Sequence, residues 1–177
     1  MSDPSILCHP NIPKPLHGIA PRVVLGKAWW DRERQKAYAN AGFCCEACGV
    51  HKRDAKHHQW LEAHEYYDYD YAKGLLKLNR LVALCHSCHN FIHSGRLEML
   101  LMREEISEEK YRDIVSHGQK VLMDAGLLDK WSARHDHDCT AQWKDWRMEI
   151  NGTLYGPSSG GMDDWRAGAW RNWKPQS

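Results

Sequence analysis

Four cysteines of this 177-residue chain stand in two pairs of equal spacing, a pattern typical of metal ligands. The pairs are Cys45 with Cys48 and Cys85 with Cys88, each a C-x2-C. Four thiolates are the ligands that tetrahedral zinc prefers in structural sites. We therefore expect these residues to hold one structural zinc ion. Cys44 in place of Cys45 would make the first pair C-x3-C, which is the alternative ligand set.

Histidines next to the second cysteine pair could hold a further ion. His89 and His93 are four residues apart, so a helix would present both on one face. Upstream, residues 60–65 alternate in a way that predicts a short strand, with Trp60, Glu62 and His64 on one face. Because four thiolates already satisfy zinc, the histidines are available for a separate divalent ion.

The order of elements around these residues is a second observation. A second strand is predicted at 81–84, and a short helix after it should end near Gly95 as its C′ residue. The chain therefore runs from a cysteine pair through a strand, a loop and a second strand to the other cysteine pair and a helix.

Residues 29–96 resemble the HNH endonucleases, whose ββα-metal motif is commonly enclosed by two zinc knuckles. Residues 84–90, Leu-Cys-His-Ser-Cys-His-Asn, are similar to that family's Leu-Cys-x-x-Cys-His-Asn signature, and Leu-Glu-Ala-His at 61–64 resembles its histidine-bearing strand. The resemblance implies an α+β fold with a small ββα-metal core. It also implies that His89 and His93 bind a catalytic ion, that a strand histidine activates water and that an asparagine orients this base.

The family usually carries two adjacent functional residues on this strand, a metal ligand followed by the base. In this chain the pair is either Ala63 with His64 or His64 with Glu65, so the role of His64 depends on the register. If His64 is the base, a third ligand must come from Glu65, Asp68, Asp70 or His58. If His64 is a ligand, Glu65 is the base. We favour His64 as the base, because an imidazole pKa of about 6.5 suits neutral pH better than a carboxyl pKa of about 4.3.

The asparagine is displaced as well. The family's asparagine usually stands five positions before the second cysteine pair, where this chain has Arg80. We expect Asn79 to serve if the loop carries one extra residue, and Asn90 is the alternative.

Charge distribution favours nucleic acid as the partner. The chain carries a net charge of only +1, but residues 1–60 hold nine Lys or Arg and five acidic residues. A phosphate backbone could lie along that segment. We expect a DNA endonuclease that uses Mg²⁺, Mn²⁺, Ni²⁺ or Zn²⁺ as catalytic ion, with RNA or a protein as alternative partner. The rival hypothesis is a non-catalytic zinc module that binds nucleic acid or a protein.

The chain divides into four segments by composition. Five prolines predict an extended arm at 1–26, and the nuclease-like core at 27–96 should begin with a helix at 27–41. A helical extension follows at 97–130. A Trp-rich tail at 131–177 should contain a hairpin at 147–155. We expect the tail's tryptophans chiefly to pack. The sequence contains no apolar run of membrane length and no signal peptide, and the remaining cysteines (Cys8, Cys44 and Cys139) do not suggest a disulfide framework. We therefore expect a cytoplasmic protein without a membrane partner.

Overall fold

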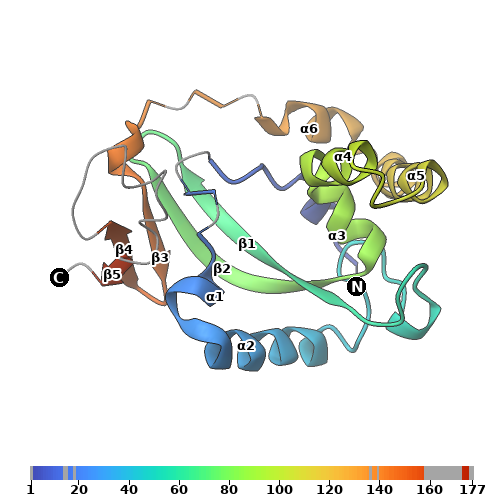
Figure 1. The fold of residues 1–177 in the computed structure, drawn as a ribbon, viewed down its shortest axis with the longest axis horizontal. Coiled ribbons are helices and arrows are strands. Elements are labelled where there is room, and N and C mark those ends of the chain that lie inside the picture. Colours follow the sequence, from blue (N-terminus) through green and yellow to red (C-terminus); the bar gives the residue numbers. More distant parts are fainter. Residues whose placement is uncertain are drawn as a thin grey trace. The chain divides into compact units, whose positions relative to one another are not determined.

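The chain has an α+β fold, as its sequence predicts. The computed structural model describes residues 2–13, 16–17, 19–135, 137–138, 140–157 and 173–175. Short helices and one longer helix come first, two long strands follow, and a group of helices precedes the last strands (Figure 1).

Two structural units share this chain, and neither is one continuous stretch. The first unit contains Met1–Asn11, Arg34–His64 and Leu81–Asp136, and the second contains Ile12–Glu33, Glu65–Arg80 and His137–Ser177. The strands β1 (Glu62–Asp70) and β2 (Leu75–Leu84) each supply residues to both units. The four consecutive segments expected from composition therefore do not coincide with these units.

The first 26 residues are not the extended arm that their prolines predicted. They contain the 3-10 helix η1 (Pro4–Cys8) and the short helix α1 (Pro21–Val24), each with proline in its first turn. Proline suits that position because its missing N–H would have no intrahelical partner there. The carboxylate of Asp3 caps η1 by accepting a hydrogen bond from the backbone N–H of Ser5 at 3.0 Å. The side chains buried in η1 are Ile6, Leu7 and Cys8.

The two central strands confirm the predicted strand, strand, helix order. β1 begins at Glu62, slightly later than the alternation from Trp60 predicted, and β2 extends further upstream than the predicted 81–84. The backbone N–H of Gly74 donates to the carbonyl of Asp70 at 2.8 Å and closes the turn between them. Gly74 has a φ of +69°, a left-handed conformation that glycine adopts readily.

The remaining strands complete one sheet in the order β1-β2-β3-β4-β5. β3 (Arg147–Ile150) pairs parallel to β2, while β4 (Thr153–Pro157) is antiparallel to both β3 and β5 (Trp173–Pro175). Asn151 and Gly152 connect β3 to β4 with φ of 52° and 79°, as a type I′ hairpin turn requires. The predicted hairpin is thereby confirmed.

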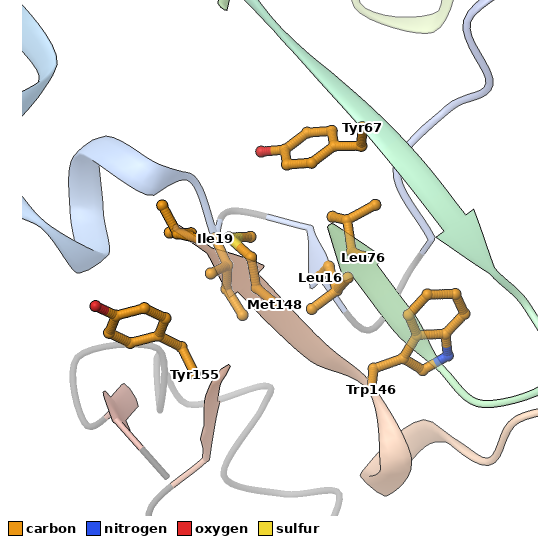
Figure 2. Packing of buried hydrophobic residues seen from close by; sticks show 8 residues of the cluster. Leu16, Ile19, Tyr67, Leu76, Trp146, Met148 and Tyr155 are labelled. Atoms are coloured by element: carbon orange, nitrogen blue, oxygen red, sulfur yellow. The ribbon is translucent and has the colours of Figure 1, made fainter. Parts of the chain in front are cut away.

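A hydrophobic cluster forms the core of the second unit (Figure 2). Trp146 is fully buried in it, as expected for a tail tryptophan, and Trp29 of α2 (Gly26–Asn40) packs partly buried against it. The buried members are Leu16, Ile19, Tyr67, Leu76, Trp146, Met148, Ile150 and Tyr155. Trp165 and Trp170 lie outside the described residues.

Helices dominate the first unit. α3 (His86–Ile92) packs against α4 (Ser94–Met102) and α5 (Glu108–Asp124), and α6 (Leu128–Ser132) follows (Figure 1). The hydroxyl of Ser107 caps α5 by accepting from the N–H of Lys110 at 3.2 Å. Among the described residues, no helix combines the length and apolar character needed to span a membrane.

Gly95 is not the C′ residue that we expected. It lies inside α4, and His93 is the residue that caps the end of α3. α4 begins immediately after this cap, so a histidine occupies the junction between two helices. The end of α3 could not be predicted from a terminating glycine, because a histidine occupies that position.

Replacing Gly118 with alanine should destabilise the first unit. A Cβ there would lie only 2.2 Å from Cγ of Phe91, so α3 and α5 would have to separate. We expect the free energy of unfolding to fall by about 2 kcal/mol or more, because overpacking outweighs alanine's helix-propensity advantage of about 1 kcal/mol. Gly95→Ala is the matched control, since a Cβ at that position would meet no neighbouring atom within 4 Å. Denaturant titration should detect a small gain there, and equal effects of the two variants would contradict the packing argument.

Candidate metal centre

The four paired cysteines converge in the first unit. Their sulfurs lie within 4.8 Å of one another, and Cys45, Cys85 and Cys88 are buried. Cys45 and Cys48 lie in the loop after α2, whereas Cys85 is the N-cap residue of α3 and Cys88 lies in its first turn. Segments far apart in the sequence therefore meet at one point.

Backbone hydrogen bonds hold the first knuckle in place. The N–H of Gly49 donates to the carbonyl of Cys45 at 2.8 Å and so closes the loop. The N–H of Glu46 donates to the carbonyl of Ala83, and the carboxylate of Glu46 accepts from the N–H of Ala83, both at 2.8 Å. These bonds fasten the first cysteine pair to the end of β2, directly before the second pair.

The cysteine geometry fits a metal ion. The sulfurs of Cys48 and Cys85 are 3.8 Å apart, much longer than a disulfide bond of about 2 Å. Zinc bonds to sulfur are about 2.3 Å, which separates neighbouring sulfurs in a tetrahedron by roughly 3.8 Å. The four cysteines can therefore hold a metal ion such as zinc.

The sulfurs also influence each other's ionisation. Hydrogen bonds with Cys45, Cys85 and Cys88 lower the pKa of Cys48, whereas hydrogen bonds with Cys45, Cys48 and Cys85 raise the pKa of Cys88. Four adjacent thiolates require a cation to be stable together. Nε2 of His117, from α5, lies 3.4 Å from the sulfur of Cys88 and can donate a hydrogen bond to it.

The other cysteines do not join this cluster. Cys44 lies beside it in sequence, but its thiol donates toward the carbonyl of Gly42 at 3.6 Å. Cys8 is buried in η1, with its sulfur 3.9 Å from the carbonyl oxygen of Leu127. Cys139 lies outside the described residues.

Three histidines form a second cluster in the same unit. His64 from β1, His89 from α3 and His93 at the end of α3 have ligand nitrogens within 4.8 Å of one another. Nδ1 of His64 is 3.2 Å from Nε2 of His93. Metal–nitrogen bonds of about 2.05 Å place neighbouring nitrogens in a tetrahedron roughly 3.3 Å apart. The helix end and the strand thus bring together the three histidines that the sequence singled out.

The environment keeps two of these imidazoles neutral. Burial, together with the nearby charges of His93, His89 and His9, holds the pKa of His64 well below its usual value. Burial, followed by the charges of His89 and Arg96, lowers the pKa of His93 to about 4. A neutral imidazole has the free lone pair that a metal ion requires.

Glu62 contacts one of the three histidines. Its Oε2 lies 2.5 Å from Nδ1 of His89, which leaves Nε2 of that ring available for an ion. Its Oε1 lies 2.6 Å from Nδ1 of His86. Although burial raises the pKa of Glu62, hydrogen bonds with His86 and His89 outweigh it and lower the pKa. A carboxylate on the far nitrogen of a ligating histidine orients the ring and increases its basicity.

Sequence reasoning missed His9 altogether. It caps η1 and is buried, and its Nδ1 lies 3.3 Å from Nε2 of His64. This contact engages the ring nitrogen of His64 that faces away from His93. No spacing motif could have indicated His9, because it is 55 residues from His64.

The other predicted site residues are not members of the three-histidine ligand group. Glu65 follows His64 in β1, so its side chain points to the opposite face of the strand. Asn79 is an exposed residue of β2. Asn90 is buried and donates to the carbonyl of His86 at 2.9 Å, while Arg96 donates to its side-chain oxygen at 3.2 Å.

The proposed third ligands are likewise not members of the three-histidine ligand group. Asp70 accepts a hydrogen bond from the N–H of Lys73 at 2.9 Å, and Asp68 is exposed. His58 belongs to another potential ligand group, with Glu62 and His86.

Comparison of the chain with profiles of known protein families, with curated protein sequences and with solved structures finds no match.

Proposed function

We propose that this protein is a divalent-metal-dependent endonuclease that hydrolyses phosphodiester bonds in DNA. The observation that carries the proposal is the convergence of His64, His89 and His93 beside a complete four-cysteine set. Because four thiolates satisfy zinc, the histidines are available for an ion with a different task. The order of strand, strand and helix agrees with the resemblance to HNH endonucleases.

The residues around the cluster suit hydrolysis of a phosphate ester. A divalent ion, when bound, would neutralise charge on the scissile phosphate and the leaving oxygen. His89 and His93 would hold it from the end of one helix, and Glu62 orients the ring of His89. Such fixed placement matters because errors of about 1 Å can cost two orders of magnitude in rate.

An exposed cation next to the cluster supports a phosphate substrate. Arg96 is exposed on α4, and its charge contributes to the lowered pKa of His93. Its guanidinium also donates to Asn90, which ties it to α3. Arginine binds phosphate oxygens through paired N–H donors, so Arg96 is our candidate for positioning the nucleic-acid backbone.

We propose that His64 is a metal ligand rather than the base. This is the second of the two registers that the sequence allows. Its Nδ1 lies 3.2 Å from Nε2 of His93, close to the separation of two nitrogens that bind one ion, and only 4% of its surface is exposed. In this register the resemblance implies Glu65 as the base, although its side chain starts on the opposite face of β1, so the carboxylate would have to reach past the strand edge to act at the ion. The register in which His64 is the base remains the alternative to be tested.

A non-catalytic module is the second candidate function. The burial of His64 favours it, because a closed three-histidine cluster could hold an ion that only stabilises the fold. In that case the protein would bind metal at the cluster without cleaving nucleic acid.

Cleavage rate against metal concentration tests these assignments. Purified protein should nick plasmid DNA when Mg²⁺, Mn²⁺ or Ni²⁺ is added. If His64 is a ligand, His64→Ala should lower the affinity for the catalytic metal, and excess metal should partly restore the rate. Glu65→Gln should then lower the rate by about two to four orders of magnitude even at saturating metal. If His64 is the base, His64→Ala should cause that loss without changing metal affinity.

Matched measurements identify the other outcomes. His17→Ala removes an exposed histidine of the second unit and should leave the rate unchanged. An RNA of the same sequence, assayed in parallel, tests DNA preference. Metal binding without cleavage of either substrate would refute the nuclease proposal and favour the binding module.

A further inference from the structure

A third group of metal-type ligands adjoins the three-histidine cluster, since Glu62 contacts His89. Ligand atoms of His58, Glu62 and His86 all fall within 4.8 Å of one another, and all three residues belong to the first unit. His58 precedes β1, Glu62 is the first residue of β1 and His86 is the first residue of α3. Three separate positions in the chain thus direct metal-binding atoms to one point.

We propose that His58, Glu62 and His86 form a further binding site for a divalent transition-metal ion of the zinc, cobalt or nickel type. Two imidazoles with one carboxylate are a ligand set that binds zinc while leaving a position open. Mg²⁺ and Ca²⁺ prefer oxygen ligands, so two nitrogens select against them. The site does not depend on whether the protein cleaves nucleic acid.

Side-chain packing prepares this group for an ion. Nδ1 of His86 and Oε1 of Glu62 face each other in a hydrogen bond of 2.6 Å, which an ion would replace by binding both atoms. The ring of His58 meets that of His86 edge-on, with centroids 4.2 Å apart. Trp60 stacks on the ring of His58, with centroids 4.1 Å apart and planes 13° apart, and so restrains that ring.

The position of this group makes an ion accessible from solvent. All three ligands are only partly buried, and Trp60, which covers His58, is itself 55% exposed. An ion could therefore exchange here without unfolding of the unit. The buried four-cysteine cluster should release its ion far more slowly.

Glu62 links this site to the three-histidine cluster. One carboxylate oxygen faces His86, and the other lies against Nδ1 of His89. An ion at the His58 site would draw charge from the carboxylate that supports His89. We therefore expect the two sites to weaken each other's affinity when both are filled, which is a reciprocal effect.

Metal stoichiometry tests the proposal on the full chain without any cleavage assay. Protein carrying its cysteine-bound zinc is dialysed against Co²⁺ at increasing concentration, and bound metal is measured by elemental analysis. Wild type should take up two cobalt ions, His58→Ala one and His93→Ala one. The difference between the visible spectra of cobalt-loaded wild type and His58→Ala should be typical of nitrogen and oxygen ligands and should lack sulfur-to-cobalt charge-transfer bands. Its affinity should fall by at least about 100-fold in that variant.

Controls make each outcome decisive. His17→Ala should retain both cobalt ions, and Glu62→Gln should weaken both sites because they share this carboxylate. Far-UV circular dichroism and retained zinc establish that each variant is folded, with His58→Gln as a substitute if His58→Ala is not. Cobalt uptake that is unchanged in folded His58→Ala would overturn the proposal. A single wild-type ion that is lost in His58→Ala but kept in His93→Ala would support it and would count against the three-histidine site instead.

Discussion

Cys48→Ser and Cys85→Ser should each leave the chain without a stable fold. The four cysteines join the loop after α2 to the start of α3, and each variant removes a thiolate from the set. Binding of a structural zinc contributes roughly 10 kcal/mol or more, comparable with the whole stability of a typical domain. We expect loss of zinc on elemental analysis and loss of the cooperative unfolding transition by circular dichroism.

Cys44→Ser provides the matched control for these variants. Cys44 is adjacent to Cys45 in sequence but lies outside the four-sulfur cluster. It should keep its zinc and unfold at close to the wild-type midpoint. Wild-type protein that is folded but free of zinc would refute the assignment, and zinc loss in Cys44→Ser would favour the C-x3-C alternative.

His89→Ala and His93→Ala should abolish metal-dependent cleavage while the protein stays folded. Each removes one of three imidazoles that would hold the second ion, and neither touches the cysteine set. We expect the rate of plasmid nicking to fall by on the order of 10³-fold or more, because stabilisation of charge at the phosphate depends on that ion. The zinc content should remain unchanged.

Zinc content and cleavage together make this prediction specific. Loss of zinc with retained cleavage would mean that the histidines serve the cysteine-bound ion. Undiminished cleavage with full zinc would attribute the activity to another site or to a contaminant. His17→Ala, measured alongside, accounts for any general effect of removing a histidine.

Local signals correctly predicted many of the elements. The hydroxyl at Ser107 and the Asn-Gly pair at 151–152 each satisfy a backbone requirement within a few residues, so the α5 start and the hairpin were predictable. The N-terminal segment was not predictable in this way. Its prolines suggested an extended arm, whereas the cap at Asp3 and the burial of Ile6 and Leu7 accompany a 3-10 helix at Pro4–Cys8.

The sequence by itself determined the α+β class, the two cysteine pairs and the His89–His93 pair, because these depend on residue type and short spacing. It also singled out His64, but it left the role of that residue open between base and ligand. Only the tertiary structure decided that His9 contacts His64, and that Glu62 lies between His86 and His89. It also grouped Cys45 rather than Cys44 with the other sulfurs. Such contacts join residues that are distant in the chain, or distinguish neighbours by orientation. They depend on how the strands and helices pack, which short-range patterns do not encode.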